Sequence, residues 1–263
     1  MSYNDRFSGI ARLYGIEAVN AFKTCHVSII GIGGVGSWIA EALARTGFEH
    51  ITLVDMDDIC VTNTNRQIHT QVNTVGELKV EAMASRLRAI NPDIQVNPVM
   101  DFLTKDNLDT LLVDTDFVID AIDSVKVKAA LIAWCKRRKI PVVTTGAAGG
   151  QTDPTQITVG DINKTFNDPL AKKVRSLLRR EYGFSRNAKR TYGVPCIFST
   201  EQLKYPQPDG TVCQQKSFEE GAVKLDCSGG FGAATMVTAT FGFVAASYVA
   251  QKLADKANAA AKK

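Results

Sequence analysis

Four glycines near the N-terminus have the spacing of a phosphate-binding turn. Residues 31–36 read Gly-Ile-Gly-Gly-Val-Gly and lie between an apolar run expected to form a strand and a segment with helical periodicity. The glycines are Gly31, Gly33, Gly34 and Gly36. They allow a tight turn, let backbone N–H groups approach phosphate oxygens and direct the positive end of a helix dipole toward them. Asp55 ends the next expected strand, about 20 residues on, where an acidic residue meets ribose hydroxyls. The pattern predicts a nucleotide site and leaves NAD as open as ATP.

Charged residues after the glycines favour ATP. Arg66 and Lys79 follow the second expected strand, and Asp123 ends the fourth. A hydride-transferring enzyme has no need for an arginine, a lysine and an aspartate that converge near the phosphates. An enzyme that directs attack at an α-phosphate needs cations to neutralise the charge that builds on the triphosphate, and a carboxylate to hold Mg²⁺. These residue types therefore indicate adenylation chemistry.

The order of these residues resembles the ThiF/MoeB family, the bacterial relatives of ubiquitin-activating enzymes. The family pattern is GxGGxG, an aspartate at a strand end, N-x-x-R-Q, a lysine further on, and an aspartate after the fourth strand. Residues 24–150 contain every part of this pattern in the same order. The resemblance implies an enzyme that adenylates carboxylates with ATP and Mg²⁺, with a monovalent cation as a further candidate ligand.

The resemblance also implies roles for individual residues. Asp55 resembles the ribose ligand, and Asp123 resembles the carboxylate that binds Mg²⁺ and sets the catalytic geometry. The other implied nucleotide contacts are Asp57, Asn63, Arg66, Gln67 and Lys79. Arg66, Lys79 and Asp123 would be the catalytic residues.

Taken by themselves, the same residues leave alternatives open. Asn63 could cap a turn, and Asp123 could cap the helix that starts near Ser124. Arg66 could pair with Asp57 or Asp58, and Lys79 could be a solvated lysine at a helix start. His69 could assist proton transfer or be a structural hydrogen-bonding residue.

Further segments narrow the resemblance to one branch of the family. They are residues 11–15, 61–69, 144–151, 198–201 and 232–242. They resemble the branch that uses ATP to cyclise N6-threonylcarbamoyladenosine in tRNA, a dehydration through an acyl-adenylate. The alternatives are adenylation of the C-terminal glycine of a small sulfur-carrier protein, and nucleotide binding without catalysis. Carrier-activating members usually contain two CxxC pairs for zinc. This sequence has no CxxC pair, so we expect no structural zinc.

A basic stretch is the expected contact for tRNA. Residues 164–190 contain nine Lys and Arg against two acidic residues, although the whole chain has a formal net charge of only +4. Lys172, Arg175 and Arg179 are spaced to share one face of a helix expected at 170–182, where they could bind RNA phosphates. The alternative is a solvated helix face.

The family implies other partners as well. A second copy of the chain is expected, with an N-terminal arginine, Arg6 or Arg12, directed toward the neighbouring ATP. A cysteine-desulfurase and sulfur-acceptor system is a further candidate partner. Cys227, Cys196 and Cys213 lie in expected loops, and an essential covalent role for one of them stays open.

Alternating strand and helix patterns position these residues. Expected strands cover 27–30, 51–55, 96–100, 117–123 and 142–146, with 157–162 as a further candidate, and expected helices cover 35–45, 79–90 and 125–139. This order predicts an α/β fold, a Rossmann-like, doubly wound and mostly parallel sheet with an irregular α+β C-terminal part. We expect residues 1–263 to form one adenylating unit. Within it, residues 1–160 are the nucleotide-binding core, 161–230 a basic, loop-rich substrate segment, and 231–263 a C-terminal helix and tail.

Composition agrees with a folded intracellular protein. Of 263 residues, 45% are apolar and 22% charged, which excludes disordered and fibrous chains. The first 20 residues lack the apolar segment of a secretory signal, so a cytoplasmic location is expected. Residues 231–250 are apolar enough for a hydropathy scan to flag them. Their many small residues predict a buried core or dimer-interface helix, and no membrane span.

Overall fold

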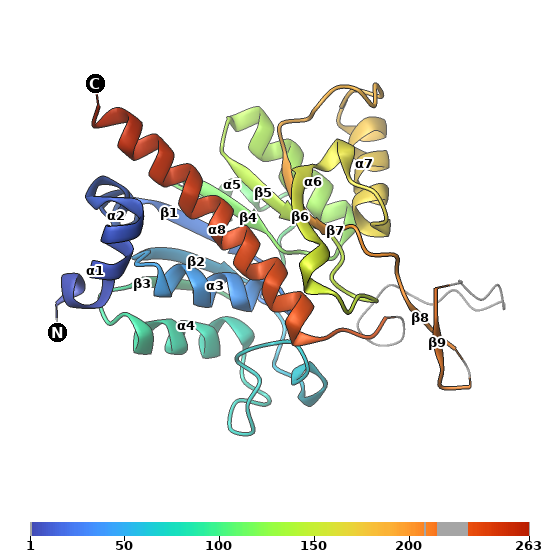
Figure 1. The fold of residues 1–263 in the computed structure, drawn as a ribbon, viewed down its shortest axis with the longest axis horizontal. Helices are drawn as coiled ribbons and strands as arrows, with labels where there is room; N and C mark the ends of the chain where they lie inside the picture. The colour runs from blue at the N-terminus through green and yellow to red at the C-terminus, as the bar shows by residue number, and fades with distance from the viewer. Residues whose placement is uncertain (1, 208, 215–230, 263) are drawn as a thin grey trace.

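A seven-stranded sheet forms the centre of the molecule (Figure 1). The computed structural model describes residues 2–207, 209–214 and 231–262. The strands are β1 (His26–Ile30), β2 (His50–Val54), β3 (Gln95–Val99), β4 (Phe117–Asp120), β5 (Val142–Thr145), β6 (Ile157–Asp161) and β7 (Pro195–Ser199). Their order is β3-β2-β1-β4-β5-β7-β6, and β6 alone among them runs antiparallel to its neighbour. The strand order reverses between β1 and β4, as in doubly wound folds. The α/β sheet predicted from the sequence is confirmed.

Helices cover both faces of the sheet. They are α1 (Tyr3–Tyr14), α2 (Ile16–Thr24), α3 (Gly36–Arg45), α4 (Lys79–Ile90), α5 (Leu108–Leu111), α6 (Val125–Arg138), α7 (Pro169–Glu181) and α8 (Thr235–Ala260). Short 3₁₀ turns η1 (Val61–Asn63), η2 (Pro154–Gln156) and η3 (Ile162–Lys164), and a small hairpin of β8 (Tyr205–Pro206) and β9 (Val212–Cys213), complete the described elements.

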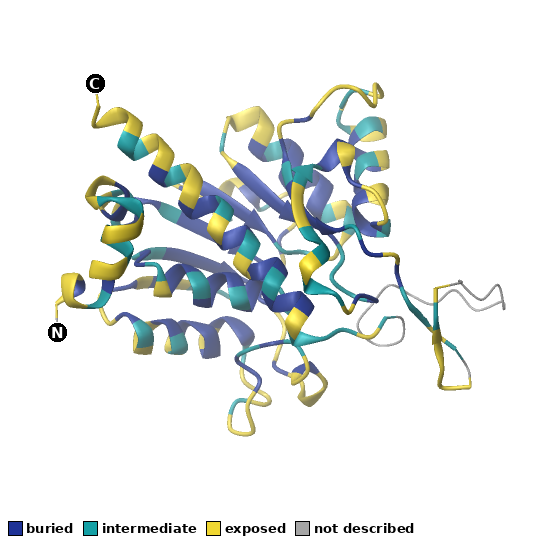
Figure 2. Cartoon of the chain, viewed as in Figure 1, coloured by how far each residue is buried: buried dark blue, intermediate teal, exposed yellow. Residues whose placement is uncertain are grey.

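Alternating strand residues build two separate cores. Val27 and Ile29 of β1 pack in the cluster that contains residues of α2, α3, α4 and α8. Ile30 packs on the opposite face, in the cluster with residues of α5, α6 and α7. Successive side chains of a strand point to opposite faces, so a sheet covered on both sides needs the near-continuous apolar strands seen here. The sheet is accordingly buried along most of its length (Figure 2).

Two parts of the fold differ from the sequence prediction. β7 was not expected, because its five residues lie in a stretch with weak periodicity, yet it inserts between β5 and β6 and extends the main sheet. The N-terminal helices α1 and α2 were not expected either, although Ser2 and Asp5 form a capping box at the start of α1.

The C-terminal helix α8 belongs largely to the core, as predicted. It runs diagonally across one face of the sheet (Figure 1), with Val237, Phe241 and Val249 buried. A Cβ added to Gly242 would lie 2.8 Å from Cβ of Trp38, so α8 and α3 pack at a distance that requires glycine. Among the described residues, no helix is both long enough and apolar enough to cross a membrane.

A buried ion pair connects β4 to α6. Nζ of Lys128 lies 2.9 Å from Oδ1 of Asp120, and the two side chains are 1% and 0% exposed. Thr144 of β5 accepts a hydrogen bond from Lys128 at 3.0 Å and donates one to Asp120 at 2.6 Å. Every strong polar group of this cluster therefore has a partner inside the protein, which offsets the cost of removing two charges from water.

Removing one member of this pair should destabilise the fold. We expect Lys128→Met to lower the free energy of unfolding by about 3–5 kcal/mol, because Asp120 would be left as an unpaired buried charge. Lys126→Met, at an exposed position of the same helix, should change it by less than about 0.5 kcal/mol. Denaturant unfolding of both variants measures the difference. Equal stability of the two variants would contradict the role given to the pair.

Candidate functional site

The site is a cavity of about 630 Å³ at the carboxyl ends of the parallel strands. We call it the central pocket. It is lined by residues of the turns that follow β1, β2, β3, β4 and β5, together with residues of α7 and of the segment before α8. The pocket spans the point between β1 and β4 where the strand order reverses, which is where doubly wound sheets bind ligands.

The predicted glycine turn forms one wall of this pocket. Gly31 has φ of +88°, and a Cβ there would lie 2.8 Å from the carbonyl oxygen of Ala121. Gly31, Gly33 and Gly34 line the pocket. Gly36 has a different role, because it is buried at the first position of α3 and a Cβ there would lie 1.8 Å from the carbonyl oxygen of Gly31. Three glycines thus offer backbone to a ligand, and the fourth allows the turn to close.

Asp55 fixes the turn from the end of β2. Its Oδ2 accepts a hydrogen bond from the backbone N–H of Ile32 at 2.6 Å, and its Oδ1 accepts one from that of Asp57 at 2.9 Å. Burial raises the pKa of the Asp55 carboxyl, while nearby Lys79 and the two N–H donors oppose the rise. Each carboxylate oxygen keeps a lone pair for a further donor, so Asp55 can still accept from ribose hydroxyls.

Two of the predicted cations reach the same pocket from different segments. Lys79 begins α4, and its Nζ lies 2.7 Å from Oδ2 of Asp57. Nη1 of Arg66 donates to the carbonyl oxygen of Thr62 at 2.9 Å and to Oδ1 of Asn65 at 2.8 Å. Asp57 therefore pairs with Lys79, and the alternative in which it pairs with Arg66 is wrong for this structure. Both cations line the pocket where negative charge on a ligand would be neutralised.

Asn63 lies in the turn η1 and is not among the residues that line the pocket. Its Oδ1 accepts a hydrogen bond from the backbone N–H of Cys60 at 3.0 Å, and this bond stabilises the turn η1. The asparagine that lines the pocket is Asn65, whose Nδ2 donates to the carbonyl oxygen of Ala233 at 2.8 Å. The turn-cap alternative thus describes Asn63 here. Gln67 lines the pocket as expected, and its buried Oε1 has no partner among the described residues.

Asp123 lies in the turn between β4 and α6, exposed and lining the pocket. The N-cap residue of α6 is Ser124, so the alternative that Asp123 caps this helix does not hold. Within the described part of the chain, Asp123 has no hydrogen bond or ion pair. Among those same residues, no group of three or more acidic, His or Cys side chains could hold a metal. A single free carboxylate in a pocket would suit Mg²⁺ if a ligand supplied phosphate oxygens, because Mg²⁺ usually binds one or two carboxylates together with such oxygens.

His69 supports the glycine turn from the interior. Its Nε2 lies 2.9 Å from the carbonyl oxygen of Ile32, and a carbonyl can only accept, so Nε2 carries the proton. Burial lowers the pKa of His69 to about 4, and the ring is therefore neutral at physiological pH. The structural alternative describes this histidine better than proton transfer does.

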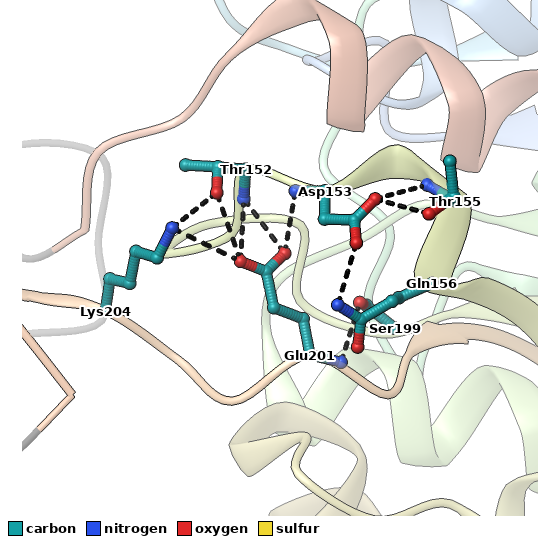
Figure 3. A network of polar contacts seen from close by, with 7 residues as sticks. All are labelled: Thr152, Asp153, Thr155, Gln156, Ser199, Glu201 and Lys204. Carbon is teal, nitrogen blue, oxygen red and sulfur yellow. Dashed lines mark hydrogen bonds and ion pairs between the residues drawn. The ribbon is translucent and has the colours of Figure 1, made fainter.

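The wall near β5 and β7 depends on a carboxylate that the sequence analysis did not single out. Glu201 accepts hydrogen bonds from the backbone N–H groups of Thr152 at 2.9 Å and Asp153 at 2.8 Å, and lies 3.6 Å from Nζ of Lys204 (Figure 3). Burial alone would raise the pKa of Glu201, but these donors outweigh it and lower the pKa. The network fixes the loop that carries Leu203, which lines the pocket.

Two of the predicted RNA contacts are half-buried and hydrogen-bond to neighbouring segments of the protein. Arg175 donates to the carbonyl oxygen of Ile162 at 3.1 Å and to Thr165. Arg179 donates to Tyr192 at 2.9 Å and to Asn163 at 2.7 Å. They hold α7 against neighbouring segments, so the expected face of Lys172, Arg175 and Arg179 is not a free cationic surface. Lys172 is exposed.

The three candidate cysteines differ in their location and burial. Cys196 is buried on β7, and burial raises the pKa of its thiol well above the ordinary range, which makes it a poor nucleophile. Cys213 lies partly exposed on β9. Cys227 lies outside the described residues.

The family of the chain agrees with this fold and pocket. The ThiF family model matches residues 7–263, and the chain belongs to the ThiF family.

Particular relatives are similar over nearly the whole chain. One is the tRNA threonylcarbamoyladenosine dehydratase of Escherichia coli K12, 58% identical over 97% of this chain and 96% of that protein. The solved structure titled TcdA (CsdL) superposes with a TM-score of 0.90 at 57% identity and covers 99% of this chain and 97% of its own. The E. coli enzyme TcdA in complex with ATP superposes with a TM-score of 0.85 at 54% identity. The match covers 97% of this chain and 96% of that chain.

Two glycines of the turn should respond differently to alanine. We expect Gly36→Ala to destabilise the fold by about 2–3 kcal/mol, because its Cβ would overlap the backbone of Gly31. Gly34→Ala should fold normally, because its Cβ meets only the flexible side chain of Arg66, at 3.2 Å, but it should weaken nucleotide binding. Thermal unfolding and nucleotide titration measure the two effects.

Gly9→Ala is the matched control. Gly9 is exposed within α1, where alanine should stabilise by up to about 1 kcal/mol. If Gly36→Ala were as stable as this control, the close approach in the turn would not constrain the fold.

Proposed function

We propose that this chain uses ATP to cyclise N6-threonylcarbamoyladenosine in tRNA, a dehydration that forms a hydantoin ring. The observation that carries the proposal is the convergence of Asp55, Arg66, Lys79 and Asp123 on one pocket beside the glycine turn. The relatives named above that match nearly the whole chain are tRNA threonylcarbamoyladenosine dehydratases, and one of them was solved in complex with ATP. The reaction belongs in the cytoplasm, where tRNA is available.

The chemistry needs an activated carboxylate. An oxygen of the threonyl carboxylate attacks the α-phosphorus of ATP, and the bond from that phosphorus to the β-phosphate bridge breaks, so pyrophosphate leaves. A ureido nitrogen of the same group then attacks the acyl carbon, AMP leaves and the nitrogen loses its proton. The second step is intramolecular, so it gains strongly from proximity and needs no enzymic thiol.

The pocket residues divide this work. Asp55 accepts from the ribose hydroxyls, while the glycine turn presents backbone N–H groups to the phosphates. Arg66 and Lys79 neutralise charge that develops on the α-phosphate and on pyrophosphate. Asp123 would hold Mg²⁺, which when bound offsets further phosphate charge. Asp57 keeps Lys79 directed into the pocket through their ion pair at 2.7 Å.

Adenylation of a sulfur-carrier protein is the less favoured function. Its usual zinc-binding CxxC pairs do not occur in this sequence. The molybdopterin-synthase adenylyltransferase of E. coli is 34% identical, over only 58% of this chain. A carrier activator would exchange pyrophosphate in the presence of a carrier protein without RNA, which separates the two functions.

The active form that we propose is a homodimer. Met236 and Phe243 of α8 are 64% and 46% exposed, and Thr240 and Ser247 continue the same helix face. A second copy would cover this apolar face, and Arg12, exposed on α1, is the candidate to reach the neighbouring site. We also propose that the protein binds a monovalent cation and interacts with a cysteine-desulfurase and sulfur-acceptor system. Light scattering should report about twice 28.5 kDa, and an active monomer would reject the dimer.

Turnover tests the proposed reaction directly. Incubation of the protein with ATP, Mg²⁺ and tRNA that carries N6-threonylcarbamoyladenosine should convert this nucleoside to a product lighter by one water, with release of AMP and pyrophosphate. Nucleoside mass spectrometry measures the conversion. Failure to convert the nucleoside, combined with carrier-dependent pyrophosphate exchange, would replace this function with the alternative.

Two substitutions should abolish turnover without loss of the fold. We expect Arg66→Ala and Asp123→Ala to reduce turnover by about 10³-fold, since each removes charge that acts on the phosphates. Asp93→Ala, at an exposed position remote from the pocket residues, is the control and should keep full activity. Circular dichroism verifies folding. Near-normal turnover by either pocket variant would show that its role is misassigned.

A further inference from the structure

The central pocket has a second wall that the nucleotide contacts do not use. The nucleotide wall consists of the glycine turn, Asp55, Arg66 and Lys79. The second wall includes the turn after β5, Leu170 and Lys173 of α7, Leu203, and Phe231. A substrate that must bring its carboxylate to ATP has to occupy this side of the same cavity.

We propose that Lys173 binds an anionic oxygen of the RNA substrate and so positions the modified nucleotide against ATP. The proposal rests on the proposed function and adds a residue that determines substrate binding. The anionic oxygen belongs either to the threonylcarbamoyl carboxylate or to a phosphate beside the modified nucleotide.

The distribution of charge in the pocket singles out this lysine. Of the cationic side chains in the described part of the chain, Arg66, Lys79 and Lys173 line the pocket. Lys79 is paired with Asp57, and Arg66 donates to Thr62 and Asn65. Lys173 is exposed and makes no hydrogen bond or ion pair with any residue that the structure describes. It can therefore accept an anionic partner without breaking an internal contact.

The start of α7 holds Lys173 at the pocket edge. Asp168, the N-cap residue, accepts hydrogen bonds from the backbone N–H groups of Ala171 at 2.8 Å and Ala147 at 3.0 Å. A Cβ added to Gly146 would lie 1.7 Å from Oδ2 of Asp168, so α7 and the turn after β5 meet in close contact. This buried carboxylate joins the helix to the pocket, and the lysine one turn further on has a defined position.

The second wall of the pocket suits a base as well as an anion. Leu170, Leu203 and Phe231 give the second wall apolar and aromatic surface. Single nucleotides of RNA are commonly recognised after they leave the stack, with the base against apolar or aromatic side chains and the phosphates on cations. A lysine beside such a wall matches this arrangement.

The experiment compares two adjacent lysines of one helix. Lys173→Ala should raise KM for modified tRNA about tenfold, because a charge-assisted hydrogen bond is lost, and should leave KM for ATP unchanged. Lys172, a candidate RNA contact from the sequence, is exposed and is not among the residues lining the pocket. Lys172→Ala removes the same charge outside the pocket and should raise KM for modified tRNA clearly less than Lys173→Ala does. Lys173→Arg should restore most of the binding, which a loss of helix packing would not allow.

Binding of modified and unmodified tRNA separates the two sources of the anion. Equal weakening for both RNAs, with a shallower salt dependence, assigns Lys173 to a phosphate. Weakening for modified tRNA alone assigns it to the carboxylate. Either result supports the proposal. A raised KM for ATP with unchanged tRNA binding, or equal effects of Lys172→Ala and Lys173→Ala, would overturn it. If the parent protein binds tRNA but does not cyclise it, the proposed function fails while this comparison still reports on Lys173.

Discussion

The close approach of the glycine turn to the end of β4 sets the geometry of the whole site. Gly31 lies so near the carbonyl oxygen of Ala121 that no side chain fits between them. Gly36 approaches the carbonyl oxygen of Gly31 even more closely, so the turn closes directly into α3. Because Asp123 follows Ala121 by two residues, this contact brings its carboxylate into the pocket that the glycine turn lines. His69 and Asp55 then hold Ile32, the residue between the first two glycines, through its carbonyl oxygen and its N–H group.

Charged residues at and beneath the pocket form two layers, one buried and one exposed, and the two layers have different roles. Below the pocket, Asp120, Lys128 and Asp168 are buried, and each has hydrogen-bond partners that fix a strand end or a helix start. Above them, Asp123 and Lys173 are exposed in the pocket and have no such partner among the described residues. Charge inside a protein is tolerated only when it is paired, so the buried layer is rigid. The exposed layer keeps its capacity for ligands, which is the arrangement that catalysis on phosphates requires.

Cations of the basic stretch, residues 164–190, differ in what they contact. Arg175 and Arg179 share a helix face, as their spacing predicts, but that face lies against η3 and Tyr192. A guanidinium has five donors and a long apolar stem, so it can bond carbonyl and hydroxyl groups at a half-buried boundary. Lys173, which follows Lys172 of the predicted face, is the residue among these four cations that lines the pocket.

Most strands of the sheet and the glycine turn could be predicted from the sequence, because strand periodicity and turn chemistry are local properties. Asp55, Arg66, Lys79 and Asp123, the residues that the sequence singled out, line one pocket, because their positions at strand ends and a helix start follow from the parallel topology. The structure was needed to show that Asn63 supports a turn while Asn65 lines the pocket, that Arg175 and Arg179 bond to neighbouring segments, and that β7 inserts into the sheet. Those outcomes depend on which distant segment packs against each residue, and the spacing of residues along one chain does not contain that information.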